Sequence, residues 1–172
     1  GRHSDAGAGA SPHRRPQERP SLRQALHDRR RGGIEGDDTD GHIDDTTRFI
    51  NEDTVVACVE NNVDDDNYRI LQTNLAMLKK MRLVNGKQLN VIELPMPEAV
   101  VIDDLRTPGS YANFLICNAG VIVPVFNNRN DQVAIDILEK AFAGRKIIPL
   151  EADRIIWGQG SFHCLSQQEP AV

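Results

Sequence analysis

The chain has 172 residues, of which 40% are hydrophobic and 26% charged, and its formal net charge is −5. This length suits one domain with a buried core of ordinary size. No apolar run approaches the roughly 20 residues needed to cross a bilayer, and the start of the chain lacks the apolar segment of a secretory signal. We therefore expect a cytoplasmic protein with no membrane partner.

Residues 1–32 differ in composition from the rest of the chain. They contain eight Arg, two Asp and one Glu, a net charge of +5, which leaves −10 for the remainder. Their few apolar residues cannot offset chain entropy, so we predict a disordered tail outside the ordered part, residues 33–172. Arg29–Arg31 could contact phosphates, but no aromatic residue is present to stack on a base, and the acidic remainder would repel a polyanion. We expect a solvated tail and no nucleic-acid partner.

The first ordered elements predicted are a strand and a helix. Residues 54–59 form a β-branched run typical of a buried strand. Asp64–Asp66 supply candidate caps and negative charge for a helix that Asn85-Gly86 would end. The apolar face of that helix repeats at spacings of three and four and comprises Tyr68, Leu71, Leu75 and Leu78.

Strand patterns return further along the chain. Leu89–Leu94 and Ala99–Ile102 are predicted strands, separated by two prolines that cannot donate to a central ladder. A loop follows around Pro108-Gly109. Asn113–Cys117 and Val121–Val125 flank Asn118-Ala119-Gly120, a pattern that predicts a hairpin.

The last regular elements are a helix and a strand. Asp131 is the predicted cap of a helix that Gly144 ends, and a strand is predicted at Lys146–Leu150. The buried helix face would comprise Ala134, Ile137, Leu138 and Ala141. This order of elements indicates an α/β fold with hairpins, distinct from a doubly wound parallel sheet. Gly158-Gln159-Gly160 lacks the third glycine and the helix of a nucleotide fingerprint, so no nucleotide is expected.

Two segments concentrate reactive side chains. In an extended segment, His42 and Asp44 would project from the same face, because side chains alternate along a strand. A carboxylate beside an imidazole suits chemistry on a cation, with the histidine moving protons near neutral pH. Cys164 is the candidate nucleophile, and it follows a glycine-rich approach that permits close access of a substrate.

Four stretches resemble motifs of agmatine deiminases. Gly33–Phe49, which contains His42 and Asp44, resembles a central motif of that family. Gly109–Phe114, Asn118–Phe126 and Trp157–Gln168 resemble later motifs in the same order. Several separate motifs in order are a specific signal, whereas any one alone would be weak. The resemblance implies a pentein fold, a fivefold pseudo-symmetric α/β propeller of ββαβ-like units, of which this chain would supply about the last two.

The resemblance also implies an activity and roles for individual residues. Agmatine would be hydrolysed to N-carbamoylputrescine and ammonia, a step of polyamine synthesis that needs neither a metal nor an organic cofactor. Cys164 would attack the guanidinium carbon, and His42 would protonate the departing ammonia and then activate water. Asp44 would hold the guanidinium nitrogens, with Asp38 and Asp40 near the substrate amine. Assembly into a homo-oligomer is left open.

Part of the family's pattern is missing from the sequence. Two substrate carboxylates of the family, in Arg-Asp-x-Gly-Pro-like and Glu-Gly-Gly-like motifs, have no counterpart here. The composition before Gly33 favours a frameshift or an incorrect start, which the coding DNA read in another frame would test. We expect little or no activity from this chain alone. The alternatives are a peptidyl-arginine deiminase and a non-catalytic fragment with a binding or structural role.

Several reactive residues also have a structural interpretation. We interpret Cys58 and Cys117 as small hydrophobic residues buried in the core. Three widely spaced cysteines indicate neither a disulfide framework nor a zinc site. His163 would point away from Cys164 on an extended strand, as a structural or secondary contact. The acidic cluster Asp37, Asp38 and Asp40 could hold calcium, but the twelfth position from Asp38 is Phe49 where a calcium loop needs Glu.

Overall fold

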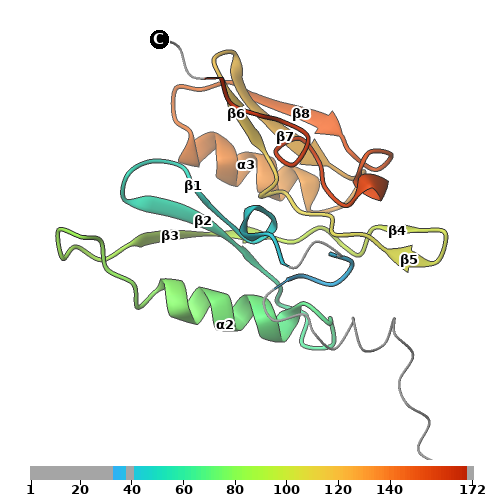
Figure 1. Cartoon of the computed structure of the whole chain (residues 1–172), viewed down its shortest axis with the longest axis horizontal. Helices are drawn as coiled ribbons and strands as arrows, with labels where there is room; N and C mark the ends of the chain where they lie inside the picture. Colours follow the sequence, from blue (N-terminus) through green and yellow to red (C-terminus); the bar gives the residue numbers. More distant parts are fainter. Residues whose placement is uncertain (1–32, 38–40, 170–172) are drawn as a thin grey trace, which may run out of the picture.

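Two three-stranded sheets with the same connectivity form the framework of the computed structural model, which describes residues 33–37 and 41–169 (Figure 1). In the first sheet, β1 (Thr47–Phe49) pairs antiparallel with β2 (Thr54–Val59). Helix α2 (Tyr68–Leu78) then returns the chain to β3 (Asn90–Pro95), which pairs parallel to β2. The predicted tail and the predicted substrate contacts Asp38 and Asp40 lie outside the described residues.

The second sheet repeats this connectivity. Strand β6 (Leu115–Cys117) pairs antiparallel with β7 (Gly120–Val125), helix α3 (Asp131–Ala141) follows, and β8 (Ile147–Glu151) pairs parallel to β7. A two-stranded ribbon of β4 (Val101–Ile102) and β5 (Leu105–Arg106) connects the two ββαβ units. The predicted α/β class is thus confirmed, whereas the count of five units stays a prediction.

The layers alternate between helix and sheet, with α2 on one face of the first sheet and α3 between the two sheets (Figure 1). Strand β2 is buried along its whole length because it has a helix on each side. Its residues Val55, Ala57 and Val59 pack in the cluster that contains Leu75 and Leu78 of α2. The alternate residues of β2, Val56 and Cys58, face the opposite way and belong to the larger core cluster that contains Leu138 of α3. Each fully buried aliphatic side chain stabilises the fold by roughly 1.5–3 kcal/mol.

The first predicted helix is confirmed, but its ends differ from the prediction. It ends at Leu78, and Asn85-Gly86 instead forms a turn closed by a bridge between Arg82 and Gln88. Its N-cap is Asn67, and Asp65 accepts a hydrogen bond from the Asn67 N–H at 2.8 Å. The predicted caps at residues 64–66 are therefore wrong, because these residues precede the cap and the Asp65 side chain orders the turn before the helix.

The predicted hairpin at residues 113–125 and the second helix are also confirmed. Gly120 has a φ of 153°, and a Cβ there would lie 2.3 Å from the Lys146 carbonyl oxygen, so only glycine fits this turn. Asp131 is the first helical residue and Asn130 the cap; the Asp131 carboxylate accepts hydrogen bonds from Phe126 N and Asn128 N.

Among the residues that the structure describes, no helix has the length and apolar character needed to span a bilayer.

Candidate active site

The three side chains that the sequence indicated as reactive lie together. One donor atom each from His42, Asp44 and Cys164 falls within 4.8 Å of the other two. The Cys164 Sγ lies 3.3 Å from Oδ2 of Asp44, although the two residues are far apart in the sequence. His42 and Cys164 are exposed and Asp44 is half-buried, so a small molecule could reach the cluster from solvent.

The sequence analysis assumed that His42 and Asp44 lie in an extended segment, and the structure shows that this assumption is wrong. Residues Ile43–Asp45 form a 3-10 helix, and His42 precedes it with an extended backbone. Three residues per turn send successive side chains in different directions. Ile43 is therefore 70% exposed, Asp45 is 1% exposed, and Asp44 faces the thiol. The backbone N–H of His42 donates to Asp37 at 3.2 Å.

Cys164 lies in a turn, which makes the predicted direction of His163 wrong. Leu165 N donates to Ser161 O at 3.0 Å, so the chain curls where an extended strand was assumed. This curl brings His163 Nδ1 to 2.6 Å from Asp44 Oδ2. A Cβ at Gly160 would lie 2.7 Å from the Cys164 sulfur, so the thiol occupies the space where a side chain at position 160 would be.

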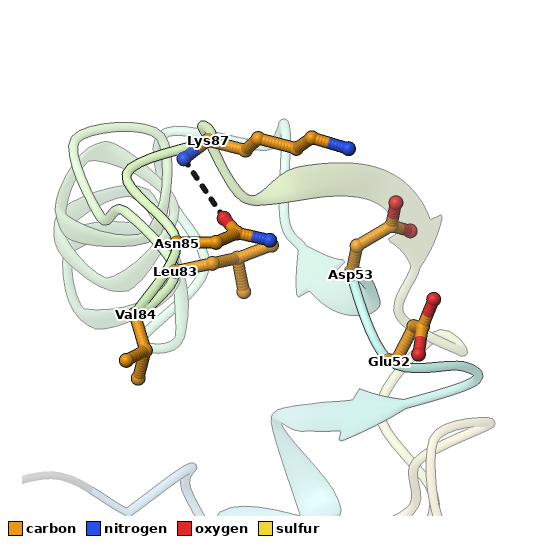
Figure 2. A pocket seen from close by; sticks show the side chains of 6 residues that line it. All are labelled: Glu52, Asp53, Leu83, Val84, Asn85 and Lys87. Atoms are coloured by element: carbon orange, nitrogen blue, oxygen red, sulfur yellow. Dashed lines mark hydrogen bonds between the residues drawn. The ribbon is translucent and has the colours of Figure 1, made fainter.

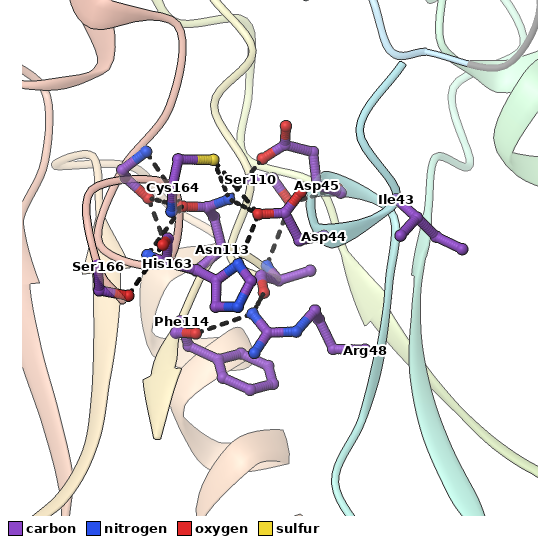
Figure 3. Close-up of polar contacts among 12 residues, drawn as sticks. Ile43, Asp44, Asp45, Arg48, Ser110, Asn113, Phe114, His163, Cys164 and Ser166 are labelled. Atoms are coloured by element: carbon purple, nitrogen blue, oxygen red, sulfur yellow. Dashed lines mark hydrogen bonds and ion pairs between the residues drawn. The ribbon is translucent and has the colours of Figure 1, made fainter. Parts of the chain in front are cut away.

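Asn113, which the sequence did not single out as functional, lies between these two segments (Figure 3). Its side chain is completely buried. The Nδ2 group lies 3.1 Å from Asp44 Oδ2, 2.9 Å from Asp45 Oδ1 and 3.0 Å from Cys164 Sγ. Asn113 is the penultimate residue of one of the motif-like stretches, but no local pattern points to its partners, which lie 48 to 69 residues away.

The two adjacent carboxyls of this site have opposite protonation preferences. Burial opposes ionisation of Asp44, but hydrogen bonds from His163 and Cys164 outweigh it and hold the pKa of this carboxyl below its ordinary value. Burial raises the pKa of Asp45 to about 8, and the charges of Asp44 and Asp37 add to that rise. Oδ2 of Asp45 has no hydrogen-bond partner within the described part of the chain. Asp44 is therefore the anion of the pair at neutral pH.

The thiol of Cys164 is held in its protonated form. Burial, together with the charges of Asp45 and Asp44, raises its pKa to about 11 despite the hydrogen bond from Asn113. Arg48 is the nearby cation: burial lowers its pKa, and Asp44 and Cys164 act in the opposite direction. A second cation placed between Asp44 and the sulfur would lower the pKa of the thiol, because it would favour the thiolate.

The other cysteines and a surface hollow lie elsewhere. Cys58 is buried with Sγ 3.4 Å from the Ser110 hydroxyl, and burial raises its pKa to about 12, as expected for a structural thiol. Cys117 is half-buried. The hollow opens between the β1–β2 turn and the loop after α2, and no residue of the reactive cluster lines it (Figure 2). Its lining residues are Glu52, Asp53, Leu83, Val84, Asn85 and Lys87.

A metal is the remaining alternative for the cluster. An imidazole, a carboxylate and a thiol are also the side-chain types that bind zinc in proteins. The expectation of a metal-free site rests on the sequence resemblance, which reads the same three groups as base, substrate anchor and nucleophile.

Comparison with known proteins identifies the chain's relatives. The family model for Porphyromonas-type peptidyl-arginine deiminase matches residues 28–170. An agmatine deiminase of Pseudomonas aeruginosa (strain LESB58) is 32% identical over 157 residues, covering 81% of this chain and 43% of that protein.

Solved structures agree with this comparison. The agmatine deiminase of Enterococcus faecalis has a TM-score of 0.75 at 29% identity, over 81% of this chain and 43% of that one. A cysteine-to-serine variant of the C. jejuni agmatine deiminase with substrate bound has a TM-score of 0.70 at 36% identity, over 77% of this chain and 38% of that one. The chain thus spans about two-fifths of the length of these relatives.

Proposed function

Because the chain belongs to the Porphyromonas-type peptidyl-arginine deiminase family, we propose that residues 33–172 are the C-terminal part of an agmatine deiminase. In the complete enzyme, agmatine and water are converted to N-carbamoylputrescine and ammonia. The relatives named agmatine deiminase support this substrate. The observation that carries the proposal is the meeting of His42, Asp44 and Cys164 within 4.8 Å.

The reaction follows from the chemistry of these three groups. The thiol proton of Cys164 passes to His42 as the sulfur bonds to the guanidinium carbon, and His42 gives that proton to the departing ammonia as the bond from the carbon to one terminal nitrogen breaks. Water then gives one proton to His42 while its oxygen bonds to the same carbon. The carbon–sulfur bond breaks, the remaining hydroxyl proton returns to the sulfur, and the ureido product leaves as His42 releases its proton to solvent. No electron is gained or lost overall, so the proposed reaction needs no redox cofactor, and these side chains account for each step without a metal.

Asp44 links substrate binding to activation of the nucleophile. Its carboxylate is ionised and lies 3.3 Å from the sulfur, so a guanidinium bound there lies beside the thiol. That positive charge offsets the two carboxyls that raise the pKa of Cys164. The substrate thereby generates the thiolate that attacks it, and the resting thiol stays protonated.

The wider setting follows from the same proposal. The product leads to putrescine, so the enzyme serves polyamine synthesis and acts on a small-molecule substrate in the cytoplasm. The two ββαβ units of the chain then belong to a five-unit propeller, whose other units complete the substrate pocket. The missing substrate carboxylates make weak or absent turnover the expected result for this chain alone, because each charged contact stabilises the transition state by about 3 kcal/mol.

A labelling experiment tests the site without requiring turnover. We compare the rates at which Cys164 is alkylated by chloroacetamidine, which is cationic, and by chloroacetamide, its neutral counterpart. The amidine should react faster, agmatine should slow it, and Asp44→Asn should abolish the preference. Asp53→Asn, on the β1–β2 turn away from the cluster, is the matched control. Equal rates for both reagents, or a preference that persists in Asp44→Asn, would contradict the proposal.

Turnover is measured in parallel. Ammonia release from agmatine is assayed with the chain, with Cys164→Ala and with Cys117→Ala, which changes a cysteine outside the cluster. Any rate above background should vanish only in Cys164→Ala. A rate that Cys164→Ala leaves unchanged would remove this cysteine from the mechanism.

A further inference from the structure

We propose that Asn113 is the positioning residue of this site: its amide oxygen holds the turn that carries Cys164, and its N–H donates to the cysteine sulfur. The inference rests on the proposed function, because it names what holds the nucleophile in place. Four observations support it: the burial of Asn113, the donors around its oxygen, the acceptors around its nitrogen and the anchoring of its backbone.

The oxygen of the Asn113 side chain faces only donors. Oδ1 lies 3.1 Å from Ser161 N, 3.0 Å from Ser161 Oγ, 3.1 Å from His163 N and 3.3 Å from Cys164 N. Three of these donors are backbone N–H groups of the turn itself, which cannot accept a hydrogen bond. One side-chain atom therefore organises the turn from residue 161 to residue 164.

This arrangement fixes which end of the amide faces the sulfur. Since backbone N–H groups surround one end, that end must be the oxygen, and the NH₂ group must face the opposite side. There it meets only acceptors: the sulfur of Cys164 at 3.0 Å and the carboxyl oxygens of Asp44 and Asp45. Two hydrogens serve three acceptors, so the thiolate, once formed, competes with the carboxyls for donation (Figure 3).

The backbone on both sides of Asn113 is anchored by Arg48. Its Nη1 donates to the Ala112 carbonyl at 3.2 Å and to the Phe114 carbonyl at 2.9 Å, and its guanidinium lies 4.7 Å from the centre of the Phe114 ring. Arg48 belongs to β1 of the first unit, whereas Asn113 directly precedes the second. The amide is thus held at the junction between the segments that supply the carboxylate and the thiol.

The N–H donation affects how readily the thiol ionises. The groups that face the sulfur are two carboxyls, Asp44 and Asp45, which oppose the thiolate, and the cation Arg48, which favours it. His42 and His163 flank the Asp44 carboxylate. Among the described groups, Asn113 is the neutral side chain that donates a hydrogen bond to the sulfur. Removing this donation should raise the pH at which the thiolate forms.

Two variants separate donation from added charge. Asn113→Ala removes the donor without adding charge, and Asn113→Asp keeps an acceptor oxygen but replaces the donor by a carboxylate. The rate of Cys164 alkylation by neutral iodoacetamide is followed from pH 8 to pH 10 by peptide mass spectrometry, below the pKa of about 11, where the rate is proportional to the thiolate fraction. Both variants should slow alkylation at pH 9 about tenfold, the size of a one-unit rise in the pKa of the thiol. Asn118→Asp makes the same charge change on an exposed turn and should leave the profile unchanged.

An unchanged alkylation rate at pH 9 in Asn113→Ala overturns the proposal, even if Asn113→Asp slows alkylation, because the effect would then be charge alone. Should the variants not fold, the wild-type chain decides. The side-chain NH₂ resonance of Asn113 should shift with pH in parallel with the rise in alkylation rate and lose that shift in Cys164→Ser, whereas a resonance that does not shift as the rate rises overturns the proposal. These readouts use no agmatine or amidine, so failure of the amidine preference would reject the proposed function and leave this result standing.

Discussion

Asp45→Asn should flatten the dependence of stability on pH. The Asp45 carboxyl ionises near 3.8 in an unfolded chain but stays protonated in the folded protein up to about 8. Its stabilising effect is therefore complete below about pH 4 and is lost as pH rises to about 8, at about 1.4 kcal/mol per unit. Between pH 5 and pH 7, the wild-type chain should lose about 2.7 kcal/mol of unfolding free energy through this group.

The asparagine variant lacks this titration. Its oxygen can still accept from Asn113 Nδ2, which lies 2.9 Å from Oδ1 of Asp45. Its NH₂ group replaces the unpartnered Oδ2, at a cost of about 1–3 kcal/mol at every pH. The informative quantity is therefore the difference between the two chains in urea denaturation at pH 5 and pH 7, in which other titrating groups cancel. Asp153→Asn, at an exposed position, should keep the wild-type slope. Parallel curves for wild type and Asp45→Asn would refute the argument.

Three further substitutions test other contacts. Gly120→Ala should destabilise the chain by about 3 kcal/mol in urea denaturation, because a Cβ would lie 2.3 Å from a carbonyl oxygen at a φ of 153°, whereas Gly158→Ala, with open space around it, should change little. Arg48→Met should cost about 3 kcal/mol by the same assay, since two carbonyls lose a charged donor. Asp44→Asn should speed iodoacetamide alkylation of Cys164 about tenfold at pH 8, because it removes a charge that raises the pKa of the thiol; an unchanged rate would contradict that cause.

The regular elements were predictable wherever apolar periodicity was long enough to read. The β-branched run of β2 and the spacing of Leu71, Leu75 and Leu78 in α2 each correspond to a burial pattern in the structure. The three-residue β1 and the two-residue β5 are too short to show a period, and the sequence analysis missed them. The strand predicted at Ala99–Ile102 is present only as the two residues of β4. Helix α2 ends earlier than expected because the chain beyond Leu78 turns toward β3 well before its glycine.

In the site too, the residues marked by a local sequence motif were predictable, and those defined by partners distant in sequence were not. His42, Asp44 and Cys164 could be chosen because their chemical types and surrounding motifs are local in sequence. The role of Asn113 depends on partners brought near only by the packing of two units, which no local pattern records. The direction of His163 was mispredicted because alternation along a strand was assumed where the chain makes a turn.

The reactive cluster lies at the junction of two ββαβ units, so its reactivity depends on the packing of these two units against each other. The imidazole and carboxylate precede β1 of one unit, and the thiol follows β8 of the other. Neither unit alone contains the reactive group of its neighbour, so separation of the units leaves an ordinary solvated cysteine and an ordinary solvated histidine. The chemical behaviour of a single sulfur atom therefore reports whether the two halves of this molecule have come together.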